Sequence, residues 1–202
     1  MYAQAAKEAH DDEQGQEARF KQARLSYFMG EFEWARAQLD VLKSATSRLV
    51  ANDALELSLL ISENLDPDST YTMLQIYSKA DLMVMRNKPT TALQLLDSIG
   101  NALLGHPIQD EVVLKKALIN RSMNRYHEAD SLFKTLYNFY PDGIWAAKAL
   151  SERAKILDLI LGKPTEALPL YQLLITRFGS SFYAEEARKR YREINSQTQP
   201  AL

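Results

Sequence analysis

ALINRSMNRYHEADSLFKTLYNFYP, residues 117–141, is the stretch of sequence that decides the fold. Ala117 falls late in one segment of helical periodicity, Ala129 falls early in the next, and residues 124–125 form a short turn between them. Small side chains at these two positions let antiparallel helices approach closely. Bulky residues of the second helix then fill the space beside a neighbouring unit: Tyr126, Phe133 and Leu136. The stretch therefore predicts a helix-turn-helix unit.

Looser copies of this unit recur along the chain. Alanines in the position of Ala129 occur three more times, at Ala35, Ala92 and Ala167. The spacing from Ala92 to Ala129 is 37 residues and that from Ala129 to Ala167 is 38, whereas Ala35 and Ala92 are 57 apart. An excess of about 20 residues is what one additional helix with its loop would use. The chain is thus expected to hold four units and one extra helix.

The punctuation of the chain favours an all-α fold. Apolar residues recur every three or four positions, and most glycines and prolines fall where a helix has to end. Gly30 is expected to end a helix with positive φ. We predict a single domain over residues 1–202. Its parts are a frayed leading helix over residues 3–13, a break near Gly15, units at about 16–44, 68–104, 109–140 and 141–178, an extra helix at about 48–64 and a capping helix at 181–194.

The order of alanine, aromatic residue and closing proline in residues 117–141 resembles the tetratricopeptide repeat. This resemblance implies a right-handed superhelix of antiparallel helix pairs, which is TPR-like. It is weakest in the fourth unit, where Lys155 falls at the small-residue position and Ala154 substitutes for it by a slip of one residue. Residues 167–194, ALPLYQLLITRFGSSFYAEEARKRYREI, also resemble the helical repeats of bacterial cell-envelope proteins.

Bulk composition excludes several classes of protein. The 202 residues are 46% hydrophobic and 25% charged, which is ordinary for a soluble globular chain. A formal net charge of −2 gives no field that would collect nucleic acid, so we expect no nucleic-acid partner. The chain has no cysteine and no apolar run near the roughly 20 residues of a membrane helix. We therefore expect no transmembrane segment and no cysteine-based metal site, while the compartment stays open.

A search for chemistry predicts no catalytic, metal or cofactor site. None of the three histidines has a second histidine three or four residues away, and no Gly-x-Ser-x-Gly or phosphate-binding glycine loop occurs. Acidic pairs lack the spacing of a calcium loop. The basic run at residues 188–192 lies among glutamates, which favours a solvated capping helix. We expect a protein that is not an enzyme and needs no cofactor. An enzyme with a site of scattered acids and tyrosines is a remaining alternative.

A binding surface follows from the resemblance. In stacked helix pairs of this family the first helices line the inner curve. Aromatic residues with an arginine are typical of binding hot spots, and the first unit is rich in them. The alternative for Phe20 and Phe28 is burial against the leading helix. The candidate protein-binding residues are Phe20, Arg24, Tyr27, Phe28, Tyr77, Asp81, Met85, Lys115 and Arg121.

The leading hypothesis is a non-enzymatic scaffold that binds a protein or peptide segment on its concave face. The envelope resemblance implies a periplasmic or outer-membrane-associated assembly factor, with a cytoplasmic protein as the alternative. The rival hypothesis is a structural spacer or self-association module of a larger protein, which would form a homo-oligomer.

Overall fold

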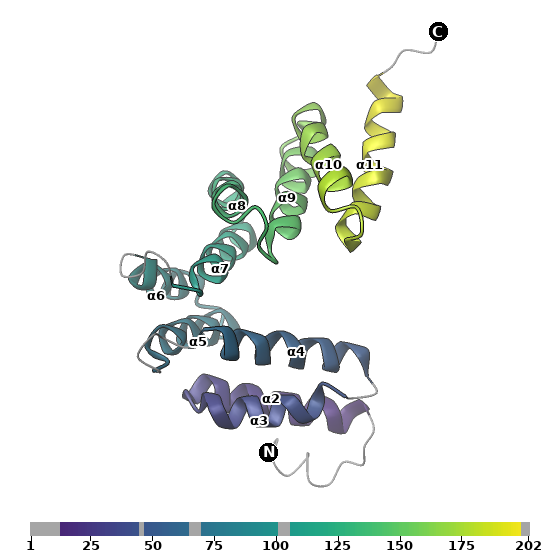
Figure 1. Cartoon of the computed structure of the whole chain (residues 1–202). Helices are drawn as coiled ribbons and strands as arrows, with labels where there is room; N and C mark the ends of the chain where they lie inside the picture. The colour runs from purple at the N-terminus through teal and green to yellow at the C-terminus, as the bar shows by residue number, and fades with distance from the viewer. Residues whose placement is uncertain (1–12, 45–46, 65–69, 101–105, 199–202) are drawn as a thin grey trace. The chain divides into compact units, whose positions relative to one another are not determined.

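The computed structural model describes residues 13–44, 47–64, 70–100 and 106–198 (Figure 1). In that part of the chain it contains ten α-helices and one π-helical turn. The helices pack as consecutive antiparallel pairs, the arrangement of a helical repeat, so the all-α expectation is confirmed. By contacts the chain divides into two compact units, Met1–Gln109 and Asp110–Leu202, which we call unit 1 and unit 2. The single-domain assignment stays a prediction.

Five helices form unit 1. Its elements are α2 (Glu13–Met29), α3 (Phe32–Leu42), α4 (Arg48–Glu63), α5 (Thr72–Met85) and α6 (Pro89–Gly100). The pairs α2/α3 and α5/α6 are the two predicted helix-turn-helix units, and α4 is the predicted extra helix. Helix α4 lies against α3, where Ser58 donates a hydrogen bond of 2.9 Å to Asp40, while α5 packs on α2. The insertion thus lies beside the second helix of the first pair, and the two first helices remain in contact.

Unit 2 continues the pattern with four helices and a fifth that closes it. Its elements are α7 (Gln109–Ser122), α8 (Tyr126–Phe139), α9 (Ala146–Lys155), the π-helical turn η1 (Ile156–Ile160), α10 (Pro164–Arg177) and α11 (Phe182–Thr198). One buried cluster joins α7, α8 and α9 around Phe133 and Leu136. A second joins α9, α10 and α11 around Leu150, Tyr171 and Leu174. Helix α11 packs on both α10 and α9, as the first helix of a further pair would.

The small-residue positions found from the sequence are buried within the helix pairs. Eight alanines occupy them, and each is fully buried with no exposed surface: Ala23, Ala35, Ala80, Ala92, Ala117, Ala129, Ala154 and Ala167. A larger side chain at any of them would have to displace the partner helix. The burial expected at these positions from the sequence is observed, including at Ala154 in the fourth unit.

Each of the four turns contains one residue with a left-handed backbone. These residues are Gly30, Asn87, Asn124 and Gly162, with φ of 82°, 56°, 60° and 66°. Glycine and asparagine adopt this conformation at low cost, and it lets the following backbone N–H reach back to a carbonyl in the last helical turn. In the third turn Arg125 N–H donates to the carbonyl of Asn120, five residues back, at 2.9 Å. In the fourth, Lys163 N–H reaches Leu157, six residues back, at 2.8 Å.

The additional residue in the fourth turn belongs to η1. A π-helical turn accommodates one residue more than an α-helix does, because its hydrogen bonds run from i to i+5. Leu161 N–H accordingly donates to the carbonyl of Ile156 at 2.9 Å. The turn buries Asp158, which is 5% exposed, and directs Leu159 to solvent, where it is 61% exposed. This turn was not predicted.

Some predicted boundaries are wrong. The break near Gly15 does not occur, because Gly15 is buried within the first turn of α2. The capping helix is longer than predicted and reaches Thr198. The leading helix expected over residues 3–13 lies, up to residue 12, outside the described residues. No helix among the described residues combines the length and the apolar character that crossing a membrane requires.

Candidate functional site

The aromatic face predicted in unit 1 is largely part of the core. Tyr27 of α2 is 1% exposed and donates a hydrogen bond of 3.0 Å from its hydroxyl to Asp81 of α5. Burial, and then the neighbouring Asp81, raises the pKa of Tyr27. Tyr77 is 4% exposed. The structure thus brings Tyr27, Tyr77 and Asp81 together, but at the contact between α2 and α5 rather than on an open surface.

Arg24 forms the solvent side of this contact. Its guanidinium lies 5.9 Å from the ring centre of Phe20 and 5.5 Å from that of Phe28, so a cation–π stack holds the three side chains together along α2. All three are half-buried. Phe28 also lies against the Tyr27 ring, with centroids 5.4 Å apart. The leading helix, against which Phe20 and Phe28 were alternatively expected to bury, lies outside the described residues.

The other predicted residues are separate from this group. Met85 is the last residue of α5 and is 53% exposed. Lys115 and Arg121 lie on α7, in unit 2, and both are half-buried. Arg121 forms an ion pair of 2.7 Å with Glu152 of α9. A binding role for these nine residues stays a prediction.

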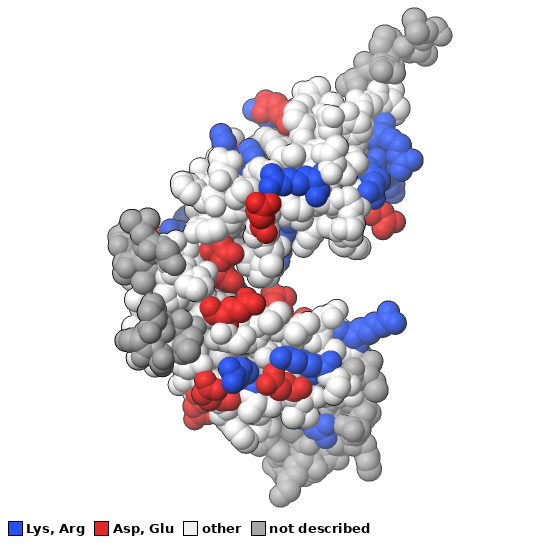
Figure 2. Space-filling model, viewed as in Figure 1, with Lys and Arg blue, Asp and Glu red and all other residues white. Residues whose placement is uncertain are grey.

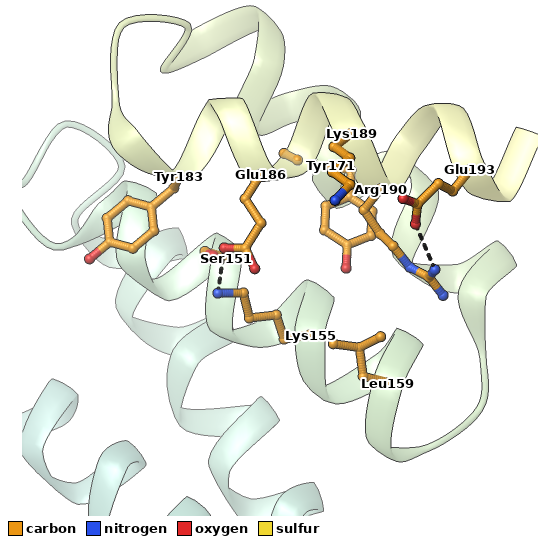
Figure 3. A pocket seen from close by; sticks show the side chains of 10 residues that line it. Ser151, Lys155, Leu159, Tyr171, Tyr183, Glu186, Lys189, Arg190 and Glu193 are labelled. Carbon is orange, nitrogen blue, oxygen red and sulfur yellow. Dashed lines mark hydrogen bonds and ion pairs between the residues drawn. The ribbon is translucent and has the colours of Figure 1, made fainter.

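Unit 2 holds a pocket between α9 and α11, and α10 contributes Tyr171 to its lining (Figure 3). Both α9 and α11 occupy the position of the first helix in a helix pair. Its volume is about 290 Å³, at the lower limit of the range for small-molecule sites and large enough for one or two side chains of a protein segment. The lining is mixed, with charged, hydroxyl and apolar groups. It consists of Ser151, Lys155, Leu159, Tyr171, Tyr183, Glu186, Ala187, Lys189, Arg190 and Glu193.

Asp158, which is buried in η1, holds two of the lining residues, Tyr171 and Arg190. Both carboxylate oxygens of Asp158 accept from Arg190 of α11, from Nε at 2.6 Å and from Nη2 at 2.9 Å. The hydroxyl of Tyr171, on α10, donates to the same carboxylate at 3.0 Å. A two-pronged guanidinium–carboxylate pair fixes orientation as well as distance. Three consecutive elements, η1, α10 and α11, are therefore joined through one buried acid.

The titration of this group follows from its contacts. The hydrogen bonds from Arg190, with a further contribution from Tyr171, hold the pKa of Asp158 below its usual range. Burial and the Asp158 carboxylate raise the pKa of Tyr171. Arg190 also donates from Nη1 to Glu193 at 3.0 Å. At neutral pH the group is a charged network in which Asp158 accepts from two donors at once.

Two groups in the lining keep bonding capacity for a ligand. Ser151 is 2% exposed, and within the described part of the chain its hydroxyl makes no hydrogen bond. Lys189 is exposed and has no ion-pair partner among the described residues. Beside Ser151, Lys155 of α9 and Glu186 of α11 form an ion pair of 2.7 Å (Figure 3). The arrangement offers a hydroxyl at depth, paired charges across the opening and the exposed Leu159 at the edge.

A second perturbed carboxyl occurs at the start of α7. Glu111 is 7% exposed, and burial together with Asp110 raises its pKa to about 8. One of its carboxylate oxygens and the indole N–H of Trp145 are both buried without a hydrogen-bond partner. Such a carboxyl is protonated at neutral pH. No pocket adjoins this pair among those found in the described residues, so we treat it as a structural group.

Comparisons with known proteins add no family assignment. A scan against protein-family models finds no match, and a search of curated proteins finds none. No group of three or more potential metal ligands gathers in the part of the chain that the structure describes.

Sequence reasoning missed the pocket, although a signal for it was present. Small residues that face each other within a pair are 12 positions apart in three units, as Ala117 and Ala129 are. In the fourth unit Ala154 and Ala167 are 13 apart. The additional residue is the one that η1 accommodates, and it determines where Asp158, and with it Arg190, lies.

Proposed function

We propose that this protein is a non-enzymatic binding module of the tetratricopeptide type, and that it holds a segment of a partner protein in the pocket between α9 and α11. The family assignment rests on the sequence resemblance together with the consecutive helix pairs and their fully buried alanines. In such repeats, ligand segments lie along the first helices. The pocket has first helices on two of its sides.

The observation that carries the proposal is the hydroxyl of Ser151, which lines a pocket of about 290 Å³ and makes no hydrogen bond within the described part of the chain. A hydroxyl that makes no hydrogen bond within the protein keeps its donor and its acceptor for a ligand, and a ligand that left it unpaired would lose affinity. The ion pairs Lys155–Glu186 and Arg190–Asp158 pre-organise the walls. Because these charges already neutralise one another, the lining is better suited to holding a segment than to transferring a proton.

Peptide selection on the full chain tests this proposal. A random peptide library displayed on phage is selected on the wild-type protein, and the enriched peptides are measured by titration calorimetry. Ser151→Leu, which fills the base of the pocket, should weaken binding by about tenfold or more. Lys189→Glu should weaken the binding of acidic peptides and strengthen the binding of basic ones.

The matched control is Lys134→Glu, which makes the same charge change on the exposed face of α8. It should leave the affinity within about twofold, as expected for a residue outside an interface. If Ser151→Leu folds as the wild type does by circular dichroism and binds the selected peptides equally well, the pocket is not the binding site. Failure to enrich any peptide would contradict the proposal as a whole.

Self-association is the second candidate, and exposed apolar side chains in unit 1 favour it. Val41 and Leu49 are each 70% exposed, and Trp34 is 60% exposed. Such residues gain free energy when a second surface covers them. Light scattering across a range of protein concentrations tests the idea: a dimer that Trp34→Ala and Val41→Ser convert to monomer supports it, and a monomer at every concentration removes it.

A further inference from the structure

A second groove lies on unit 2 between α10 and α11. Its lining consists of Gln172 and Ile175 from α10 and Arg188, Tyr191 and Arg192 from α11, and its volume is about 300 Å³. The pocket described above shares none of these residues. Both arginines are exposed, Ile175 and Tyr191 are half-buried, and no acidic residue contributes to the lining. Figure 2 shows basic side chains gathered along α11.

Two of the three acids near these arginines on α11 are engaged elsewhere, and the third, Glu185, forms no ion pair with either arginine within the described residues. Glu186 pairs with Lys155 at 2.7 Å, and Glu193 pairs with Arg190 at 3.0 Å. Within the described residues neither Arg188 nor Arg192 forms an ion pair with a carboxylate. They are four residues apart on one helix face, where like charges repel. The sequence favoured a solvated capping helix for this basic run, and in the structure Arg190 pairs with acids while these two arginines are exposed.

The two guanidinium groups are nonetheless held in place. Arg188 donates from Nη2 to the carbonyl of Gly179 at 2.7 Å, and Arg192 donates from Nε to the carbonyl of Arg188 at 3.1 Å. A guanidinium has five N–H donors, so each keeps several for a ligand. Because these bonds to the backbone limit side-chain motion, an incoming anion would order little more of the protein. Arginine in this situation suits planar, two-pronged recognition of a carboxylate.

The apolar part of the groove decides between classes of partner. Nucleic acid binding relies on many Lys and Arg contacts to successive phosphates, whereas this groove has two arginines and the chain has a formal net charge of −2. An anionic membrane likewise requires a cluster of several basic residues. A groove with two arginines beside Ile175 and Tyr191 matches a segment in which carboxylate side chains lie next to an apolar one.

We infer that the α10–α11 groove is a docking surface for an acidic segment of a partner protein, which it holds through Arg188 and Arg192. The surface is independent of the pocket between α9 and α11 and does not rest on the proposed function. Substitution of Ser151 tests the pocket and substitution of Arg188 and Arg192 tests the groove, so either proposal can fail without the other.

Fluorescence anisotropy on the full chain tests the inference. The probe is a fluorescein-labelled peptide of about a dozen residues that repeats Glu-Ser-Glu-Leu, and the comparison peptide carries Lys in place of Glu. The wild type should bind the acidic peptide and not the basic one. Arg188→Glu with Arg192→Glu should weaken this binding by about tenfold or more, and Arg188→Gln with Arg192→Gln, which removes charge without reversing it, should weaken it by a smaller factor.

The matched control is Lys79→Glu with Lys134→Glu, which makes the same change in net charge at exposed positions of α5 and α8. It should stay within about twofold of the wild type at physiological salt, because neither residue lines the groove and salt screens exposed charges that are not in direct contact. Equal losses in the two double variants would show that net charge alone is responsible and would overturn the inference. Arginine-dependent binding of oligothymidylate or of phosphatidylserine vesicles, without binding of the acidic peptide, would overturn it in favour of another class of ligand.

Discussion

In unit 1 the first helices α2 and α5 meet through the ring and hydroxyl of Tyr27, whereas in unit 2 the first helices α9 and α11 meet through the ion pair of Lys155 with Glu186. The aromatic contact is buried and closed. The charged contact leaves a pocket of about 290 Å³ beside it. Aromatic side chains bury large areas and therefore tend to complete a core. Long charged side chains reach across a gap without filling it, and that gap is where a ligand segment can lie.

Truncating Tyr27 should have the largest effect on stability. Tyr27→Ala removes a ring that is 1% exposed together with the hydrogen bond from its hydroxyl to Asp81, so the free energy of unfolding should fall by about 3–5 kcal/mol. Tyr183→Ala, at the half-buried edge of the pocket, should cost less than about half as much. Urea denaturation followed by circular dichroism measures both. Equal losses of unfolding free energy would mean that the α2–α5 contact of unit 1 and the α9–α11 contact of unit 2 do not differ in packing.

Asp158→Asn should be the most destabilising change at the pocket. It removes the two-pronged partner of the Arg190 guanidinium, which keeps only Glu193, and because that arginine side chain is 30% exposed the loss should be about 2–3 kcal/mol, below the value for a fully buried pair. Arg190→Met in the Asp158→Asn background should recover part of the loss, since it removes a half-buried charge that has lost its stronger partner. An additive result in this double-mutant cycle would show that the two side chains do not act as a pair.

The same carboxyl should make unit 2 sensitive to acid. The pKa of Asp158 is lower in the folded protein than in the unfolded chain, so the folded state binds fewer protons near that pKa. Its contribution is therefore fully present above the unfolded pKa of roughly 4 and is lost as the pH falls through the folded value. The difference in unfolding free energy between wild type and Asp158→Asn should be large at pH 7 and small at pH 2.5. A difference that does not change with pH would contradict the charged network.

The contribution of Glu111 to stability should change with pH in the opposite direction to that of Asp158. The two residues therefore contrast an unpaired with a paired carboxyl within unit 2. Burial and Asp110 raise the pKa of Glu111 to about 8, so the folded state binds more protons and wild-type stability should fall as the pH rises from roughly 4.5 to 8. Glu111→Gln removes this slope and should be more stable than the wild type at pH 9 by on the order of 1 kcal/mol. Thermal melts at pH 5 and pH 9 measure the effect. A Gln variant that loses stability in parallel with the wild type would assign the slope to another group.

The smallest effect on stability is expected at Arg24, on the solvent side of the contact between α2 and α5. Arg24→Ala removes a guanidinium stacked between Phe20 and Phe28, and should cost about 0.5–1 kcal/mol. Arg24→Lys, which keeps the charge but not the planar group, should recover only part of it. A loss well above this range would place Arg24 among the core residues of unit 1.

The sequence was sufficient for the helix pairs because their determinants are local. Ala117 and Ala129, with an asparagine or glycine at the turn, impose close packing whatever surrounds them. The extra helix α4 followed from spacing alone. The same reasoning could not tell whether Tyr27 would face a partner or the neighbouring α5, because helical periodicity gives the face of a residue and not what covers that face.

The pocket was harder to predict, because it depends on a single additional residue. The slip from Lys155 to Ala154 indicated an irregularity in the fourth unit, but whether a bulge, a longer loop or a shifted helix absorbs it is decided by tertiary packing. The π-helical turn buries Asp158, and the Asp158 carboxylate then holds Arg190, which lies 32 residues later in the sequence. Pairs so distant in sequence carry no local signal.

Amide hydrogen exchange of the full chain, measured with and without a peptide selected on the wild-type protein, tests the central claim most directly. The account predicts slower exchange in residues 151–160 and 183–193, which form the walls of the pocket, and little change in residues 20–28 and 77–85. Protection of the latter residues, with the pocket walls unchanged, would contradict it and would return the binding site to the aromatic face of unit 1.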